Sequence, residues 1–300
     1  LTNIFPDIRK NLINDNQRDV EDWLNAVERQ NQELTRWIEE QLHPQHYSEL
    51  EQTPLDKEIV KHHFTERAER YDRSSHWCTD TVLRERVLDI LKPNEGHEVL
   101  DVACGTGLVS AWFHKKVKRI VGVDITEAMY VQAKDRLDAF FIGSGEHLPF
   151  EDNSFDIIIC RQGTQFMDDR AALREMYRVV KPGGTVCVIN LCAYGDKDKE
   201  EYFEVLRLRN PVRRNFYLRE DMVELFEQAT LKDIVVHNHI SNENVDIWSN
   251  NGAISEERRE AIRNMYRKGS AEFLSLHSVQ SDDSTIFVDK MLFAIVVGQK

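Results

Sequence analysis

One stretch of nine residues decides the fold, and it reads Val99-Leu100-Asp101-Val102-Ala103-Cys104-Gly105-Thr106-Gly107. Its first half is a hydrophobic run of strand character, which leads into a turn of small residues and then a helical pattern. Gly105 and Gly107 tolerate a tight turn and lack the Cβ that would keep a ligand away from the backbone. The first N–H groups of the following helix are free to bind a polar ligand. The stretch therefore predicts a strand, a glycine turn and a helix that hold a ligand; the alternative is a turn whose glycines serve packing alone.

Two acidic residues accompany this turn. Asp101 lies inside the strand, where we expect it to favour a positively charged amino group of the ligand. Asp124 ends the next apolar run, and an acid at the tip of a second strand can accept both hydroxyls of a ribose. Several classes of nucleotide-cofactor enzyme share this feature, so Asp124 alone does not select among them. The alternative is that Asp124 caps the helix that follows it.

Outward from this motif, short β-branched runs alternate with helical patterns. Strand-like runs lie at 99–103, 119–123, 140–142, 155–160, 185–190, 234–240 and 285–297. Helix-like stretches lie near 56–71, 79–91, 107–115, 126–137, 169–180, 198–208, 218–229 and 255–268. Strands separated by helices of this length predict βαβ units and a parallel sheet.

Two further motifs complete the pattern. Residues 143–150 read Gly-Ser-Gly-Glu-His-Leu-Pro-Phe and are followed by Asn-Ser-Phe-Asp at 153–156. Residues 178–184 read Arg-Val-Val-Lys-Pro-Gly-Gly, which predicts a helix that ends in a turn before the next strand.

In this order the motifs resemble the class I S-adenosylmethionine-dependent methyltransferases. They are most similar to the group typified by the ubiquinone and menaquinone C-methyltransferases (methyltransferase type 11), over about residues 60–195. The resemblance implies an α/β, Rossmann-like three-layer sandwich with helices on both faces of a seven-stranded, mostly parallel sheet, whose last strand is antiparallel. It also implies S-adenosylmethionine as the cofactor.

The same resemblance implies where the cofactor binds. In that family the glycine turn holds the methionine part of the cofactor, and the acid after the second strand holds the ribose. An aromatic–acid pair before the sheet often closes over the cofactor, and Tyr71-Asp72 resembles it here. The residues that we expect to bind the cofactor are Tyr71, Asp101, Ala103, Gly105, Gly107, Asp124, Ile125, Met129, Ser144, Gly145, Glu146 and Arg161.

Ser144 departs from the family pattern. Members commonly have Gly-Asp-Ala-Glu before Leu-Pro-Phe, and their Asp accepts a hydrogen bond from the adenine amino group. The hydroxyl of Ser144 can still accept such a bond, and Glu146 or a backbone group is the alternative acceptor. The change weakens the expectation for adenine affinity and leaves the fold expectation unchanged.

Methyl transfer from an activated donor requires few catalytic groups from the protein. The reaction is an in-line displacement from an activated donor, so alignment of the acceptor and exclusion of water matter most. A general base is needed only when the acceptor is protonated. His76 and Tyr71 are our candidates for catalytic groups; the alternative for His76 is a surface or packing role. Trp77 is expected either to stack against the acceptor or to belong to the core.

The acceptor is expected to contact residues after the fourth strand and within an arginine-rich segment. Gln162 and Gln165 follow that strand, and ligands of open α/β sheets bind beyond the carboxyl ends of strands; the alternative is that this loop only caps a helix. Five arginines fall within residues 207–219, and arginine forks suit carboxylates and phosphates. Arg213 and Arg214 therefore carry the hypothesis of an anionic acceptor, against arginines paired with acids such as Glu200 and Glu204.

Composition narrows the class of partner. The net charge of −13 argues against a surface built for nucleic acid. No apolar run is long enough to cross a membrane, and no signal peptide is expected. The five cysteines include no C-x-x-C pair, so we expect a cytoplasmic protein of small-molecule metabolism without a metal site.

The chain is expected to divide into a helical extension and a catalytic domain. Residues 1–55 form the extension, a lid or homodimer contact, and 56–300 the methyltransferase domain with lid elements at about 56–91, 195–219 and 241–283. Two other functions stay open: a non-catalytic partner-binding module and an NAD-dependent oxidoreductase. The second agrees poorly with a turn that reads Gly-x-Gly-x-x-Ser instead of Gly-x-Gly-x-x-Gly.

Overall fold

The computed structural model describes residues 55–282 and 286–300. The helices are α3 (Leu55–Arg67), η2 (Tyr71–Arg73), η3 (His76–Cys78), α4 (Thr81–Leu91), α5 (Ser110–Phe113), α6 (Glu127–Ala133), η4 (Thr164–Phe166), α7 (Asp169–Val179), α8 (Lys199–Arg209), α9 (Arg219–Gln228), α10 (Val245–Ser249), α11 (Glu256–Lys268) and α12 (Ala271–Leu276). The strands are β1 (Glu98–Val102), β2 (Arg119–Asp124), β3 (Ala139–Ile142), β4 (Phe155–Arg161), β5 (Val180–Cys192), β6 (Lys232–Asn244), β7 (Gln280–Asp282) and β8 (Ile286–Gln299). The predicted extension over residues 1–55, with its proposed homodimer contact, lies outside the described residues apart from Leu55.

The strands form one sheet in the order β3-β2-β1-β4-β5-β8-β6, and the short β7 pairs with β8. Strands β1 to β5 are parallel to one another, whereas β8 is antiparallel to both β5 and β6. The predicted mostly parallel sheet with an antiparallel last strand is confirmed, with β7 as an unforeseen eighth strand. A dinucleotide-binding sheet has the order 3-2-1-4-5-6 and lacks this inserted antiparallel strand, so the topology does not favour the oxidoreductase.

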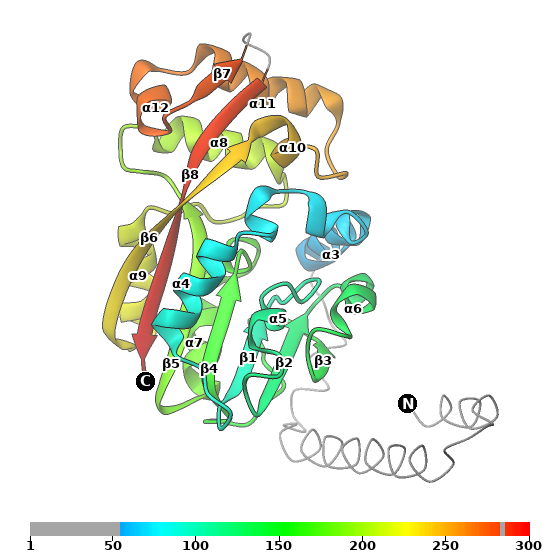
Figure 1. Ribbon diagram of the computed structural model, residues 1–300, viewed down its shortest axis with the longest axis vertical. Helices are drawn as coiled ribbons and strands as arrows, with labels where there is room; N and C mark the ends of the chain where they lie inside the picture. Colours follow the sequence, from blue (N-terminus) through cyan, green and yellow to red (C-terminus); the bar gives the residue numbers. More distant parts are fainter. Residues whose placement is uncertain (1–54, 283–285) are drawn as a thin grey trace, which may run out of the picture. The chain divides into compact units, whose positions relative to one another are not determined.

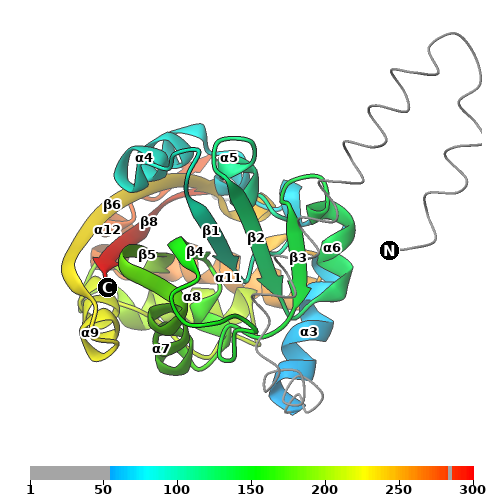
Figure 2. The same cartoon turned by 90° about the horizontal axis from the view of Figure 1, so that it is seen from below.

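Helices cover both faces of the sheet. In the view along the strands, α4 and α5 lie on one face and α7 and α9 on the other (Figure 2). The central strands are accordingly apolar throughout: Val99, Leu100 and Ile158 have no exposed surface. This continuous burial is what parallel strands covered on both sides require.

Two predicted helices are shorter in the structure. The helix expected near 107–115 is reduced to α5, because Gly107 has a φ of +76° and cannot belong to an α-helix. The helix expected near 126–137 is α6, which ends in a turn where Arg136 N–H donates to the oxygen of Ala133 at 2.8 Å. By contrast, α4 ends at Leu91 as predicted and starts two residues after the predicted position, where the Asp80 carboxylate caps it by accepting from Val82 N–H at 2.9 Å.

A cluster of helices and strand ends lies beyond the carboxyl ends of β4 and β5. It comprises α8, α10, α11, α12 and the outer ends of β6 and β8 (Figure 1). The segment predicted as a lid element at about 241–283 supplies most of it, and α10 and α12 within that segment were not foreseen. Across the described parts of the chain, no helix is long and apolar enough to span a membrane.

Candidate functional site

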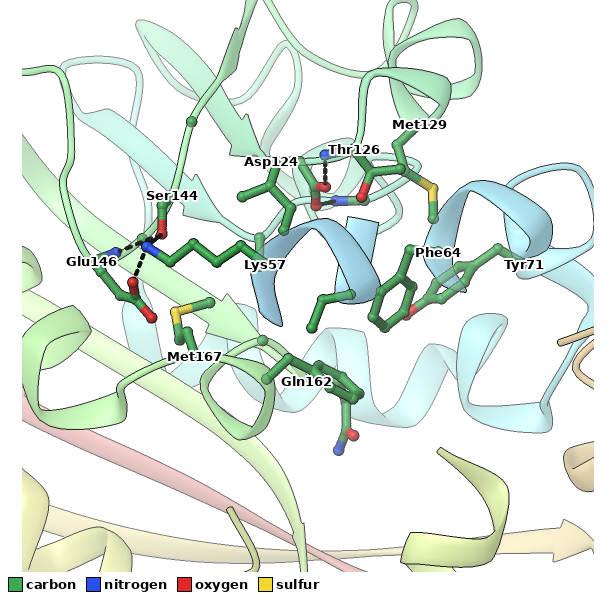
Figure 3. A pocket seen from close by; sticks show the side chains of 18 residues that line it. Lys57, Phe64, Tyr71, Asp124, Thr126, Met129, Ser144, Glu146, Gln162 and Met167 are labelled. Atoms are coloured by element: carbon green, nitrogen blue, oxygen red, sulfur yellow. Dashed lines mark hydrogen bonds and ion pairs between the residues drawn. The ribbon is translucent and has the colours of Figure 1, made fainter. Parts of the chain in front are cut away.

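The candidate site is a pocket at the carboxyl ends of β1, β2 and β4, over which α3 lies. Its volume is about 670 Å³, with the open space at its mouth included, which is within the usual range for ligand sites. The pocket is lined by Lys57, Val60, Phe64, Tyr71, Ala103, Gly105, Asp124, Ile125, Thr126, Met129, Gly143, Ser144, Gly145, Glu146, Gln162, Gly163, Phe166 and Met167. Lys57, Ser144 and Glu146 lie at one side of it, and Phe64 and Tyr71 at the other (Figure 3).

The two glycines of the turn have different tasks. Gly105 has a φ of +53°, and a Cβ on it would have nothing within 4 Å. Because Gly105 lines the pocket, that open space is available to a ligand. Gly107 packs instead against α6, where an added Cβ would lie 3.3 Å from the Cβ of Ala133. The turn therefore needs Gly105 for the ligand and Gly107 for helix packing.

Asp124 joins the second strand to the glycine turn. One carboxylate oxygen accepts from Gly105 N–H and the other from Thr126 N–H, both at 2.8 Å. Two oxygens offer about four lone pairs, so the carboxylate retains acceptor capacity toward the pocket. Burial raises the pKa of Asp124, and these backbone hydrogen bonds oppose the rise. Thr126 occupies the N-cap position of α6 without a side-chain cap hydrogen bond, so the Asp124 carboxylate that accepts from Thr126 N–H also supports the start of this helix.

Strained backbone surrounds the same space. Ala103 and Gln162 have φ values of 55° and 58°, a region that non-glycine residues seldom adopt. Both line the pocket, one after β1 and the other after β4. The two loops pack so closely that a Cβ on Gly163 would lie 2.6 Å from the Cβ of Ala103. Such strain is typical of ligand sites, where the surrounding structure holds it in place.

The aromatic–acid pair Tyr71-Asp72 connects the segment that contains α3 and η2 to the glycine turn. Asp72 accepts from the hydroxyl of Thr106 at 2.5 Å and pairs with Arg136 at 2.7 Å. These bonds place Tyr71 at the edge of the pocket, with its ring centroid 6.5 Å from that of Phe64. Burial raises the pKa of Tyr71, so its hydroxyl is protonated near neutral pH and can donate a hydrogen bond.

Lys57 was missed by the sequence analysis. Its ammonium forms an ion pair with Glu146 and donates to the hydroxyl of Ser144 at 3.3 Å. The other oxygen of Glu146 accepts from Asp168 N–H at 2.6 Å. The available signal was helical spacing, because Lys57, Val60 and Phe64 share one face of α3. That spacing does not reveal which part of the sheet the face would cover.

Three predicted cofactor residues lie behind the pocket. Asp101, Gly107 and Arg161 are not among the described residues that form its lining. Asp101 is 1% exposed and accepts from the hydroxyl of Ser110 at 2.6 Å. Burial raises the pKa of Asp101 to about 7, against the effect of that hydrogen bond and of the Arg161 charge. Direct contact between these residues and a cofactor stays a prediction.

The predicted catalytic and acceptor residues are dispersed. Tyr71 and Gln162 line the pocket, whereas His76 is exposed on a short helix outside that lining. Trp77 is buried, with Arg161 stacked over its ring at 4.5 Å. Gln165 is buried and donates to the side-chain oxygen of Gln162 at 2.9 Å. A catalytic role for His76 and an acceptor role for Trp77 stay predictions.

The structure separates Arg213 from Arg214. Arg213 is buried, and its Nε donates to the main-chain oxygen of Asn215 at 2.9 Å. Arg214 is exposed and lines a different surface hollow, together with Asp168 and Tyr217. Two neighbouring side chains with such different surroundings do not form one oxyanion fork in this arrangement. In the described part of the chain, no group of three or more His, Cys, Asp or Glu is placed to hold a metal ion.

A parallel sheet of this order, with a glycine turn after β1 and a carboxylate at the end of β2, defines a Rossmann-like class of proteins with a nucleoside-binding pocket. The family model for the methyltransferase domain matches residues 100–188. An uncharacterized methyltransferase, YcgJ of Bacillus subtilis, is 31% identical over 179 residues, which are 55% of this chain and 69% of YcgJ. The chain therefore belongs to the S-adenosylmethionine-dependent methyltransferase family, as the motifs predicted.

Other relatives agree with this family, and a solved structure agrees with the fold. A malonyl-[acyl-carrier protein] O-methyltransferase of Yersinia pestis is 32% identical over 48% of this chain and 54% of its own length. A demethylmenaquinone methyltransferase of Corynebacterium glutamicum is 34% identical over 47% and 62%. The chain thus spans little more than half the length of these relatives. The crystal structure of YcgJ has a TM-score of 0.68 and 24% identity, over 74% of this chain and 99% of YcgJ, which confirms the fold.

Proposed function

We propose that this chain binds S-adenosylmethionine in the described pocket and transfers its methyl group to a small-molecule acceptor. The observation that carries the proposal is the meeting of Gly105 and Asp124. The open face of the glycine turn and the carboxylate that accepts its N–H at 2.8 Å border the same pocket. A nucleoside with a short charged tail needs both features, one for the tail and one for the ribose.

The remaining lining fits the other parts of this cofactor. Ile125 and Met129 offer apolar surface beside Asp124, which suits the faces of an adenine ring. Ser144 offers a hydroxyl that can accept from the adenine amino group. Gly105 leaves room for the methionine part because its missing Cβ would project into open space. These residues would hold the cofactor at the carboxyl edge of the sheet, where ligands of open α/β sheets bind.

The bound cofactor supplies an activated methyl group and departs as a neutral thioether. What this chain must supply is alignment of the acceptor and exclusion of water. Phe64 and Tyr71 close one side of the pocket from the N-terminal segment. The Tyr71 hydroxyl, whose pKa is raised by burial, serves as a hydrogen-bond donor to the acceptor rather than as a base. A base is dispensable for acceptors that carry no proton on the attacking atom.

A small acceptor and a cytoplasmic location form part of the same proposal. The net charge of −13 opposes binding to nucleic acid, whose phosphates would be repelled. The five cysteines are free thiols and buried, as is usual for proteins of a reducing compartment. We propose that the acceptor carries a carboxylate or phosphate, although Arg213 and Arg214 do not converge to bind it.

The test is calorimetric titration of the full chain with S-adenosylmethionine and, separately, with NAD. Asp124→Ala removes the ribose acceptor and should weaken S-adenosylmethionine binding about 10- to 100-fold, the value of one or two hydrogen bonds to a charged group. Asp135→Ala, at an exposed position outside the pocket lining, should bind like the wild type. A folded wild-type chain that binds NAD, or neither ligand, would refute the proposal.

A further inference from the structure

Three buried arginines gather around Tyr71. Arg67, Arg161 and Arg209 are 2%, 7% and 4% exposed. The guanidinium of Arg67 lies 5.3 Å from the centroid of the Tyr71 ring, and that of Arg161 stacks on Trp77, whose ring centroid is 6.1 Å from that of Tyr71. All three positive charges act on Tyr71, where they oppose the rise in its pKa caused by burial.

The hydrogen-bond partners of these arginines are neutral. Arg67 donates to the side-chain oxygen of Asn210 at 2.9 Å. Arg209 donates to the main-chain oxygen of Trp248 at 2.8 Å and to the hydroxyl of Ser75 at 3.3 Å.

The hydrogen bond of Arg161 is longer than those of Arg67 and Arg209. It reaches the main-chain oxygen of Trp77 at 3.5 Å. Within residues 55–282 and 286–300, none of Arg67, Arg161 and Arg209 forms an ion pair with a carboxylate, and the Nε of Arg67 is buried without a hydrogen-bond acceptor.

Nearby acids compensate the cluster only in part: Glu243 raises the pKa of Arg209 and Asp101 raises that of Arg161, but burial has the larger, opposite effect on both. Glu243 is 1% exposed, and its oxygens accept from the main-chain N–H groups of His76 and Trp77 at 2.9 and 3.0 Å and from the Ser241 hydroxyl. Asp101 accepts from Ser110, and burial raises its pKa to about 7. Burial and the charge of Arg67 lower the pKa of Arg209 to about 9. Buried charges without a full counter-charge are costly, so an added anion would stabilise these three arginines.

The position of the cluster indicates which molecule brings that anion. Tyr71 lines the pocket on the side opposite Ser144 and Glu146 (Figure 3), and the proposed adenine contact is on the Ser144 side. The cluster therefore lies near the end where the methyl group would be presented. In the described chain, the pocket lining includes none of the three arginines, which favours a ligand other than the cofactor as the source of an oxyanion at the cluster.

We propose that Arg67, Arg161 and Arg209 form a subsite for a carboxylate or phosphate group of the methyl acceptor. This inference rests on the proposed methyltransferase function. It keeps the anionic acceptor but assigns the binding of its anion to these three arginines, beyond Tyr71, instead of to Arg213 and Arg214. Guanidinium forks suit both oxyanions. The subsite selects the acceptor by charge and holds it beside the Tyr71 hydroxyl.

The experiment is calorimetry on the full chain saturated with S-adenosylhomocysteine, which fills the cofactor site without turnover. The probes are malonate, inorganic phosphate and the neutral malonamide, at constant ionic strength. Wild type should bind malonate or phosphate and not malonamide, and the tighter of the two identifies the anion class. Arg161→Met and Arg209→Met should each weaken anion binding at least about tenfold, the loss expected for a charge-assisted hydrogen bond.

Matched variants separate recognition from folding. Arg207→Met removes an exposed arginine from the same helix as Arg209, one that pairs with Glu204, and should leave anion binding unchanged. Arg161→Lys keeps the charge and should retain part of the anion affinity even if Arg161→Met folds poorly. Affinity for S-adenosylhomocysteine should be the same in every variant, a result that would overturn the predicted contact of Arg161 with the cofactor.

Three results would overturn the subsite. They are anion binding that the arginine substitutions do not change, equal loss of anion and S-adenosylhomocysteine binding, and absence of anion binding in wild type that binds S-adenosylhomocysteine. Wild type that binds neither S-adenosylmethionine nor S-adenosylhomocysteine would instead refute the proposed function, so the two failures are distinguishable.

Discussion

Arg178 donates from Nη2 to the main-chain oxygen of Leu148 across 2.9 Å. The same guanidinium donates from Nη1 to the oxygen of Phe150 at 2.7 Å, while the N–H of Leu148 donates to Glu175 at 2.9 Å. Two residues one turn apart on α7 therefore hold the loop that follows β3. This contact gives a physical reason for the joint occurrence of the motifs at 143–150 and 178–184.

Arg178→Lys should destabilise the fold by about 2 kcal/mol, because a single ammonium cannot replace a guanidinium that bonds two carbonyls and the carboxylates of Glu175 and Asp152. Urea unfolding monitored by circular dichroism measures the change. Arg174→Lys, at an exposed position on the same helix, is the control and should change the free energy of unfolding by less than about 0.5 kcal/mol. Equal effects of the two substitutions would contradict the role of Arg178 in holding the loop that follows β3.

Much of the pocket was predictable because its residues follow strands. Ala103, Gly105 and Ser144 follow the ends of parallel strands, and Asp124 is the last residue of β2. Parallel strands bring their carboxyl ends to one edge of the sheet. The sequence order of the motifs is therefore enough to place these residues together. These residues meet in the pocket because the sheet topology brings the strand ends together, and short sequence motifs are enough to identify those strand ends.

Gly105→Ala should reduce the stability and the cofactor affinity at once. A φ of +53° costs an alanine about 1–2 kcal/mol, and the new methyl group projects into the pocket. Gly183 is a matched control, since its φ is +76° and an added Cβ also meets nothing within 4 Å, but it lies near the start of β5, outside the pocket lining. Gly183→Ala should lose similar stability and bind S-adenosylmethionine normally; calorimetry and thermal unfolding separate the two effects. A normal affinity in Gly105→Ala would contradict the role given to the turn.

The unpredicted part of the site comes from segments whose placement depends on tertiary packing. Lys57 and Val60 lie on a helix before the sheet, and its amphipathic pattern does not specify the surface that it covers. Arg67 and Arg209 are far apart in sequence, and they come together because the end of α8 contacts residues 67–75: Arg67 donates to Asn210 and Arg209 to Ser75. Arg161 is at the end of β4 as expected, yet its side chain stacks on Trp77 and Trp112 behind the pocket. The alternation of residues along a strand does not predict which neighbours such a side chain contacts.

A buried histidine predicts how stability depends on pH. The imidazole of His277 lies 2.7 Å from an oxygen of Asp289 and 3.1 Å from one of Asp198, and all three side chains are fully buried. Burial alone would lower the pKa of His277, but the two carboxylates raise it to about 9. Tyr266 also donates to Asp289, at 2.6 Å.

A folded-state pKa above the ordinary value of 6.5 means that the unfolded chain loses its proton first as the pH rises. The contribution of His277 is therefore complete below about pH 6.5 and is lost as the pH passes through 9, a change of roughly 3 kcal/mol. Urea unfolding between pH 6 and pH 9.5, at about half-unit steps, measures it. His277→Gln should be less stable at pH 6 and should lack this part of the pH dependence. A parallel dependence in both proteins would refute the assignment.

Ser144→Asp should strengthen cofactor binding about five- to tenfold, because a carboxylate accepts a stronger hydrogen bond from the adenine amino group than a hydroxyl does. Lys57, which donates to the Ser144 hydroxyl at 3.3 Å, would offset the added negative charge beside Glu146. The comparison is between S-adenosylhomocysteine and S-inosylhomocysteine, which lacks the amino group, on wild type and variant. The gain should appear only with the adenine compound. An equal gain with both, or none with either, would show that Ser144 does not face the adenine amino group and would place that contact on Glu146 or the backbone.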